Sequence, residues 1–318
     1  MLPNVLPHST SDHTPVLADE VRELLAVSPG ETVVDATFGA GGHARLLAFD
    51  LHGEGKLVAI DRDPSAKSHF DHFKARAGVD VRFLRGDFAI VLAQLAANEI
   101  KADAILLDLG VSSMQIDRPE RGFSYATDAP LDMRMDPSGE VTAATIVNTW
   151  DERELATIFR RFGEERYAGP IARAIIRRRA ERAFFRSGDL VDVIKMSIPT
   201  PARFGEGHPA KRVFQALRIA VNDELGQLEA ALPAAVEMLR PGGRLAVISF
   251  HSLEDRIVKK FMVAGAKGCT CPPDFPVCAC GKEPELRLLT RKPVRPSPAE
   301  LADNPRAASS RLRVSEKV

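Results

Sequence analysis

A short apolar segment that runs directly into a glycine-rich turn constrains this chain more than any other feature. Residues 32–34 (TVV) are typical of a buried strand, and residues 35–43 (DATFGAGGH) follow at once. The next apolar segment, residues 56–60 (KLVAI), ends at Asp61, 20 residues after Gly41. Glycines allow close approach to the backbone, and an acid at this spacing is placed to accept both hydroxyls of a ribose. The pattern predicts a strand–turn–helix unit that binds a nucleoside cofactor.

The residue just before the glycines narrows the choice of cofactor. Residues 39–44 (GAGGHA) fit the G-x-G-x-x-A pattern, which would admit NAD. Asp35 would repel a pyrophosphate, however, and it suits a cationic ligand with an α-amino group and a sulfonium. Residues 35–41 also fit the (D/E)-x-G-x-G-x-G motif of S-adenosylmethionine methyltransferases, with Thr37 replacing the first glycine. S-adenosylmethionine is the expected cofactor, and the alternatives are an NAD-dependent oxidoreductase or glycines that only form a tight turn.

Length and composition indicate a globular protein with one large domain or two smaller ones. The chain has 318 residues, of which 45% are hydrophobic and 27% are charged, as is ordinary for a soluble protein. No apolar run approaches the roughly 18 residues of a membrane span. Residues 1–12 also lack the basic and apolar regions of a secretory signal. We therefore expect a cytoplasmic protein with no membrane contact.

Positive charge is concentrated in two segments, although the 43 basic and 43 acidic residues cancel overall. From Arg160 to Arg186 there are nine arginines and three glutamates, and residues 285–318 have eight basic and four acidic side chains. Such local surfaces could contact the phosphates of a nucleic acid. A solvated helix face is the alternative interpretation of the arginine run.

The four cysteines form two C-x-C pairs, Cys269 with Cys271 and Cys278 with Cys280. Four thiolates could hold a tetrahedral zinc, but the usual spacing is C-x-x-C and the intervening residues are rich in proline. A disulfide is disfavoured in a reducing cytosol. We expect a small structural hairpin without metal.

Strand and helix signals alternate over the first 110 residues. Short segments with the character of buried strands lie at 32–34, 57–60, 81–84 and 104–109. This alternation predicts an α/β fold with a doubly wound, mostly parallel sheet. The ligand crevice of such a sheet lies outside the carboxyl ends of the strands. Asp35 and Asp108, which end the first and fourth strands, are therefore expected to line one pocket.

The alternation stops after Gly110. Residues 114–137 contain many turn formers and no period. Residues 143–198 have helical periodicity, with Asp151 placed as the N-cap of one helix, and residues 210–239 resemble a long helix or a helix pair.

The sheet is expected to resume after these helices. Residues 243–250 and 285–290 are predicted strands, and the chain beyond Arg295 is predicted to be a loop with partial order. The predicted division is a discontinuous α/β domain, residues 1–116 and 208–318, and an inserted all-α domain, residues 117–207.

Motifs spread over nearly the whole chain match one protein family. They are HTPVL at 13–17, DATFGAGGH at 35–43, AIDRDP at 59–64, LLDLGVSS at 106–113, RGFS at 121–124, PLDMRMD at 130–136, GEER at 163–166, IARAI at 171–175, HPAKRVFQALR at 208–218 and ISFHSLEDR at 248–256. The chain resembles the MraW family of methyltransferases. The resemblance implies a class I (Rossmann-like) fold with an inserted helical domain. It also implies methyl transfer from S-adenosylmethionine to the exocyclic N4 amino group of a cytosine in 16S rRNA of the small ribosomal subunit. A homodimer is compatible with it.

The resemblance also implies a set of cofactor contacts. These are Gly41, Gly42, His43, Asp61, Phe88, Asp108 and Gln115. The residues support most of them independently: Phe88 lies just past the third strand, after residues 85–87, where a ring can stack on or wall the adenine, and Asp87 could hydrogen-bond the adenine amine. His43 could instead only close the glycine turn, and Gln115 depends on the resemblance alone.

Asp108 and His251 are the candidate catalytic residues. Amino-methyltransferases of DNA bases commonly carry (D/N/S)-P-P-(Y/F) after the fourth strand, whereas residues 108–111 read DLGV. Asp108 fills the first position, and the stacking aromatic ring has to come from elsewhere in the chain. The candidates for this ring are Phe123, Tyr125 and Phe250.

His251 lies at the end of a predicted strand and could act as a base or contact a phosphate. The alternative is a histidine that caps the next helix. A cytosine within folded RNA would have to leave its stack to reach the methyl group. A non-catalytic RNA-binding assembly factor is the other alternative for the whole protein.

Overall fold

A seven-stranded sheet forms the centre of the protein. The computed structural model describes residues 15–203, 207–268, 271 and 280–318, and the strand order is β3-β2-β1-β4-β5-β7-β6. The strands are β1 (Thr32–Asp35), β2 (Lys56–Asp61), β3 (Asp80–Arg85), β4 (Ala102–Asp108), β5 (Leu239–Ser249), β6 (Leu286–Leu288) and β7 (Arg311–Lys317). The predicted cysteine hairpin depends on residues 269–270 and 272–279, which lie outside the described residues.

The strand order produces a crevice beside β1. The chain runs from β1 outward to β3 and then crosses back to β4 and β5, and all five strands are parallel. The direction in which successive strands are added to the sheet therefore reverses between β1 and β4, and ligands bind at such a point, outside the carboxyl ends of the strands. Asp35 ends β1 and Asp108 ends β4 at this crevice. The predicted doubly wound, mostly parallel sheet is confirmed.

The prediction of a partly ordered loop beyond Arg295 was wrong. Residues 311–317 form β7, which lies antiparallel between β5 and β6. Leu312 and Val314 of β7 are fully buried in the core. Arg313 between them is 6% exposed, and its guanidinium donates to both carboxylate oxygens of Asp255 at 2.6 and 3.3 Å. The strand could not be predicted from the sequence because a charged residue, Arg313, interrupts its apolar pattern. In the folded protein this charge is buried and neutralised by Asp255.

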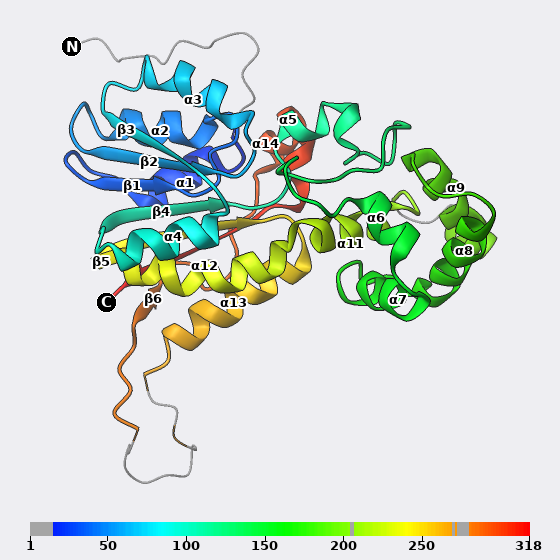
Figure 1. Ribbon diagram of the computed structural model, residues 1–318. Helices are drawn as coiled ribbons and strands as arrows, with labels where there is room; N and C mark the ends of the chain where they lie inside the picture. The colour runs from blue at the N-terminus through cyan, green and yellow to red at the C-terminus, as the bar shows by residue number, and fades with distance from the viewer. Residues whose placement is uncertain (1–14, 204–206, 269–270, 272–279) are drawn as a thin grey trace.

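Helices cover both faces of the sheet (Figure 1). One face packs against α1 (Ala18–Leu25), α2 (Gly42–Asp50) and α3 (Ala66–Lys74). The other packs against α4 (Phe88–Ala97), α12 (Glu224–Met238) and α13 (Ser252–Gly265). Because parallel strands are buried on both faces, each face contributes its own apolar cluster to the core.

A second group of helices extends away from one end of the sheet (Figure 1). It comprises α6 (Ala143–Thr149), α7 (Glu152–Arg161), α8 (Ala168–Glu181), α9 (Ser187–Ser197) and α10 (Thr200–Arg203). The predicted cap is confirmed: the Asp151 carboxylate accepts from the amide of Glu154 at 2.7 Å, and Glu154 accepts from the amide of Asp151 at 2.8 Å. This reciprocal pair satisfies two amides that the first turn of α7 would leave unbonded.

The helical group has its own apolar core, which begins at Leu131 and ends at Leu217. Leu217 belongs to α11 (Lys211–Asn222), the helix that leads back to α12 beside the sheet. The domain limits at 117 and 207 stay a prediction, and the helical core uses side chains beyond the second limit. Among the described residues, no helix is long and apolar enough to cross a membrane.

Candidate active site

The glycine turn after β1 is shaped by contact with an aromatic cluster. Gly41 has φ +78°, and a Cβ added there would lie 2.7 Å from the ring of Phe38. Phe38 in turn packs edge-on against Phe70. No other residue fits this position without moving the ring. Gly41 thus sets the path of the chain into α2, whose first residues, Gly42 and His43, face the ligand cavity.

A cavity of about 320 Å³ opens at the carboxyl ends of the parallel strands. Its wall is made by β1 and its glycine turn, by the ends of β2, β3 and β4, and by the first turns of α12 and α13. The predicted cofactor residues that line it are Gly42, His43, Asp61, Phe88, Asp108 and Gln115. The cavity wall therefore contains every predicted cofactor residue except Gly41. Gly41 contributes the backbone conformation of the turn that leads into α2.

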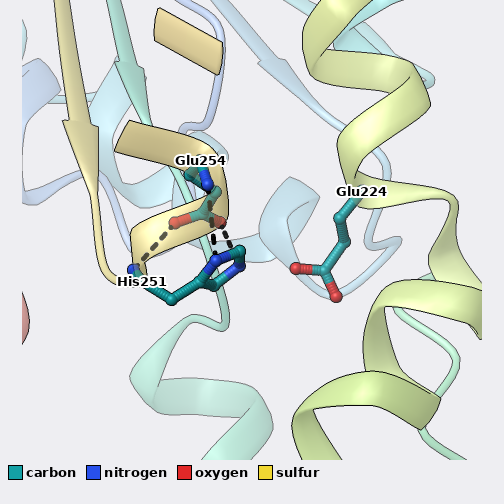
Figure 2. Close-up of side chains that lie close together, drawn as sticks. All are labelled: Glu224, His251 and Glu254. Atoms are coloured by element: carbon teal, nitrogen blue, oxygen red, sulfur yellow. Dashed lines mark hydrogen bonds and ion pairs between the residues drawn. The ribbon is translucent and has the colours of Figure 1, made fainter. Parts of the chain in front are cut away.

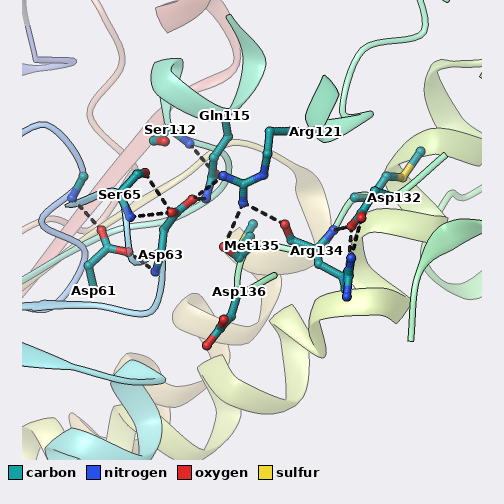
Figure 3. Close-up of polar contacts among 12 residues, drawn as sticks. Asp61, Asp63, Ser65, Ser112, Gln115, Arg121, Asp132, Arg134, Met135 and Asp136 are labelled. Carbon is teal, nitrogen blue, oxygen red and sulfur yellow. Dashed lines mark hydrogen bonds and ion pairs between the residues drawn. The ribbon is translucent and has the colours of Figure 1, made fainter. Parts of the chain in front are cut away.

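Asp61 is held in place by the turn that it faces. One carboxylate oxygen accepts from the amide of Gly39 at 2.7 Å, and the other accepts from the amide of Asp63 at 2.8 Å (Figure 3). Burial raises the pKa of Asp61 to about 6. Each carboxylate oxygen keeps a second lone pair for a ligand. The side chain can therefore receive ribose hydroxyls without changing its rotamer.

Two more carboxyl groups, the buried Asp35 and the partly buried Asp108, face the same cavity. Burial raises the pKa of Asp35 to about 7, and burial together with the charges of Asp35 and Glu254 raises the pKa of Asp108 to about 8. His43 lies 3.6 Å from Asp108, but burial lowers the pKa of its ring to about 4, so the ring is neutral. Among the described residues, no arginine or lysine forms an ion pair with Asp35 or Asp108, an arrangement that favours a positively charged ligand.

Several buried polar atoms in the cavity wall have no hydrogen-bond partner among the described residues. They are both ring nitrogens of His43, Oδ1 of Asp108, Oγ of Ser112 and Oε1 of Gln227. An unsatisfied buried polar group costs about 1–3 kcal/mol, so such groups are rare without a ligand. Together with the acids, they fit a cofactor that is cationic and carries several hydrogen-bonding groups.

Gln115 links the cavity to the segment that precedes the helical group (Figure 3). Its amide nitrogen donates to Asp63 at 2.9 Å, and its oxygen accepts from the amide of Ser112 at 3.1 Å. Arg121 donates to the same Asp63 oxygen at 3.0 Å and to the carbonyls of residues 134–135, both at 2.9 Å. Sequence analysis did not assign Asp63 or Arg121, although both fall within motifs that it singled out. Their role is to join the cofactor loops to the helical group.

His251 caps α13, as the alternative interpretation of this residue predicted. Its Nδ1 accepts from the amide of Glu254 at 3.4 Å, and its Nε2 lies 3.1 Å from a Glu254 carboxylate oxygen. Nδ1 is therefore occupied by the cap, whereas Nε2 is buried and has no hydrogen-bond partner among the described residues. A catalytic role for His251 stays a prediction, and the contacts favour positioning of Glu254.

Only one of the three candidate stacking rings lies in the cavity wall. Phe250 lines it and packs over Gly110, where an added Cβ would lie 3.4 Å from the ring. Tyr125 instead stacks on His208, with ring centroids 4.6 Å apart. Phe123 packs against the helical core. Phe250 is therefore the ring that can face a target base.

The sheet order, the glycine turn after β1 and the acid at the end of β2 define a class I methyltransferase that uses S-adenosylmethionine. The MraW methylase family model matches residues 10–318, and the chain belongs to this family. The expected cofactor is therefore confirmed, and the NAD alternative is set aside.

Similar proteins cover nearly the same length. The ribosomal RNA small subunit methyltransferase H of Heliobacterium modesticaldum is 52% identical over 309 residues, which are 96% of this chain and 98% of that protein. The protein of the same name from Symbiobacterium thermophilum is 52% identical over 309 residues, 96% of each chain. That of Geobacter sulfurreducens is 50% identical over 312 residues, 97% of this chain and 100% of that protein.

The acids of the cavity predict that cofactor affinity depends on pH. The pKa values of Asp61, Asp35 and Asp108 in the free protein are about 6, 7 and 8. A sulfonium binds more tightly when these groups are ionised, so we expect the affinity for S-adenosylmethionine to rise about tenfold or more from pH ~5.5 to pH ~8. S-adenosylhomocysteine lacks this charge and should show a smaller rise. Calorimetry at both pH values measures the difference, and equal slopes for the two ligands would contradict the prediction.

The same pKa shifts determine how the ligand-free protein responds to pH. Because burial places these pKa values above those of the unfolded chain, the stability that the protonated acids contribute is fully present below about pH 4. It is lost as the pH rises through the folded-state values of about 6 to 8. Bound S-adenosylmethionine should reduce this loss, which thermal melts with and without the cofactor can measure.

Proposed function

We propose that the protein transfers a methyl group from S-adenosylmethionine to N4 of a cytosine in 16S rRNA of the small ribosomal subunit, in the cytoplasm. The names of relatives that are about half identical over almost the full length support the ribosomal substrate. The observation that carries the chemistry is the partly buried Asp108 carboxyl group, whose Oδ1 has no partner among the described residues, in one cavity with Phe250. An aromatic face suits a planar base, and a partly buried acid suits a reaction that handles positive charge.

The proposed reaction depends on charge and position. When bound, S-adenosylmethionine supplies an electrophilic methyl group on a positively charged sulfur. Asp61 holds the ribose end, and ionised Asp108 stabilises the positive charge as it moves toward the acceptor nitrogen. Phe250 stacks on the target base after the base leaves its helix. The nitrogen then loses a proton to a carboxylate of the cavity wall.

The arginine-rich segment contributes to RNA binding through only some of its members. Arg179 donates from Nη1 to the carbonyls of Val147 and Trp150 at 2.9 and 2.6 Å, so it ties α8 to the end of α6. Arg173 lies 3.7 Å from Glu152. Such side chains stabilise the helical group, in line with the solvated-helix alternative.

The exposed arginines Arg161, Arg166 and Arg177 form no ion pair within the part of the chain that the structure describes. Arg161 and Arg166 lie over the neighbouring rings of Phe162 and Tyr167 at 5.7 and 4.8 Å, which holds their guanidinium groups in place. Charges that are free of carboxylates are available to RNA phosphates. We propose these three side chains as the phosphate contacts of the helical group.

Replacing Arg177 with glutamine should lower the salt dependence of RNA binding, because each phosphate contact contributes about 0.7–0.9 to the slope of log K against log salt. Binding to small subunits at several salt concentrations measures this slope. Affinity for S-adenosylmethionine should not change. Arg76→Gln, an exposed arginine near α3 on the sheet domain, is the matched control. An unchanged slope in Arg177→Gln would show that Arg177 does not contact RNA phosphate and is an ordinary solvated side chain of α8.

The decisive test of the function is transfer of a radiolabelled methyl group to small subunits from cells that lack the gene. The proposed activity predicts about one methyl group per subunit, recovered as N4-methylcytidine after digestion of the RNA. Subunits from cells with the gene are the control, since their site is already methylated. Binding to subunits without any transfer would favour the non-catalytic assembly factor.

A further inference from the structure

Three of the charged side chains that line the cavity were assigned no role by sequence analysis, although two of them fall within the matched motifs. They are Arg218 on α11, Glu224 at the start of α12 and Glu254 in the first turn of α13. Glu254 is 2% exposed, and the Glu224 side chain is 9% exposed. Buried charges of this kind are expensive unless they are paired or meet a ligand.

Each of these side chains is fixed by hydrogen bonds to other parts of the protein. Arg218 donates from Nε and Nη2 to the two oxygens of Glu224 at 2.8 and 2.7 Å. One oxygen of Glu254 accepts from the amides of Phe250 and His251 at 2.8 and 3.2 Å, and the His251 ring lies against the other. Figure 2 shows Glu224 pointing toward Glu254 and the His251 ring from a separate helix. Both carboxylates and the His251 ring thus lie close together, and each carboxylate is held by hydrogen bonds to the protein.

The spacing of the two carboxylates is compatible with an amino group between them. One oxygen of Glu224 and one of Glu254 lie no more than 4.8 Å from each other and from a His251 nitrogen. Two N–H···O bonds of about 2.9 Å that leave one nitrogen at roughly 110–120° reach acceptors about 4.7–5 Å apart. One –NH₂ group thus fits between the two carboxylates. Nη1 of Arg218 forms no hydrogen bond with the described residues, which leaves a donor on a side chain that lines the same cavity.

We propose that Glu224 and Glu254 each accept one hydrogen of the target amine, while Arg218 donates to the adjacent ring nitrogen of the base. This assignment rests on the proposed function and names the groups that select its substrate. Cytosine presents an amine donor next to the N3 acceptor, and it matches two carboxylates and a guanidinium. Uracil presents a carbonyl acceptor next to an N–H donor. Its carbonyl would meet the carboxylates and its N–H would meet the guanidinium, so neither pair could form a hydrogen bond.

The arrangement also prepares the nitrogen for reaction. With both hydrogens directed at carboxylates, the face of the nitrogen above the plane of the base stays open toward the methyl donor. After transfer, one of the two carboxylates is in contact with the proton that the nitrogen has to lose. Charge-assisted bonds of this kind are about twice as strong as neutral ones.

A divalent cation is the competing occupant, because two glutamates and a histidine are common metal ligands. The contacts favour the amine. Both oxygens of Glu224 accept from Arg218, and the Nδ1 atom of His251 accepts from an amide, so Nε2 of His251 is the one ring nitrogen open to a metal. A metal would have to displace these bonds, whereas an amine uses lone pairs that they leave open.

The wild-type protein provides the first test, with saturating S-adenosylhomocysteine and nucleosides as probes in saturation-transfer NMR. We expect cytidine to bind about 10- to 100-fold more tightly than uridine. N4-methylcytidine should be intermediate, because it keeps one N–H, and N4,N4-dimethylcytidine should bind as weakly as uridine. Equal affinity for cytidine and its dimethyl derivative would overturn the proposal. So would a preference that EDTA abolishes and Mg²⁺ or Zn²⁺ restores.

Glu224→Gln provides the second test, with Glu229→Gln as an exposed control on the same helix. Arg218 donates to both oxygens of Glu224, so the glutamine keeps one acceptor and puts an –NH₂ donor in place of the other. The ratio of cytidine to uridine affinity should therefore fall to about one or below, while affinity for S-adenosylhomocysteine confirms that the variant is folded. An unchanged ratio would overturn the proposal. Failure of the wild type to methylate small subunits would instead overturn the proposed function, since nucleoside binding is measured without transfer.

Discussion

Replacing Asp108 with asparagine should lower the rate of methyl transfer about 10²- to 10³-fold. Loss of one preorganised electrostatic group in an active site has an effect of this size. The asparagine side chain keeps the shape of the aspartate but cannot stabilise the positive charge as it passes from sulfur to nitrogen. Oδ1 of Asp108 has no partner in the described structure, so the substitution breaks no hydrogen bond there.

The rate should be measured in a single turnover at saturating S-adenosylmethionine, which separates chemistry from binding. Asp80→Asn is the matched control and should retain the wild-type rate. Asp80 is exposed and begins β3, so it lies at the end of the sheet away from the cavity. A full single-turnover rate in Asp108→Asn would remove Asp108 from the catalytic residues. A reduced affinity with an unchanged rate would limit its role to cofactor binding.

Replacing Asp61 with alanine should weaken the binding of S-adenosylmethionine about 10- to 100-fold, since hydrogen bonds to a charged group contribute about 1.5–3 kcal/mol. The substitution removes the proposed ribose acceptor. It also leaves the amides of Gly39 and Asp63 without their partner, so the glycine turn loses an anchor. Calorimetry measures the affinity directly.

Asp61→Asn separates these two contributions. Its single amide oxygen can serve only one of the two backbone amides, so we expect an affinity between those of the wild type and the alanine variant. Asp80→Asn again serves as the control and should bind as the wild type does. Wild-type affinity in Asp61→Ala would show that Asp61 does not hold the cofactor.

The positions of Asp35, Asp61 and Asp108 could be predicted because parallel sheets follow strict connection rules. Each residue ends an apolar segment, and the carboxyl ends of neighbouring parallel strands meet at one edge of the sheet. Residues at the carboxyl ends of neighbouring parallel strands are therefore expected to lie close together in the folded protein. Gly41 is similar, because a tight turn between strand and helix requires a residue that tolerates positive φ.

The role of His251 could be narrowed only with its neighbours in view. In the sequence it ends a strand and precedes a helix, which is compatible with a base, a phosphate contact or a cap. In the structure, Nδ1 accepts from the amide of Glu254, three residues later, and Nε2 has no hydrogen-bond partner among the described residues. Which nitrogen is free in a histidine depends on contacts of the folded chain, and the residue type does not reveal it.

The sequence by itself determined the class of fold, the cofactor turn and the acids around it, because strand periodicity, glycine conformation and helix capping act over a few neighbouring residues. The tertiary structure alone decided that Arg218, Glu224 and Glu254 meet beside that cofactor site. They come from three helices, and each would pass in the sequence for an ordinary charged residue of a helix. Their burial and mutual distance arise from the packing of α11, α12 and α13, which no local pattern encodes.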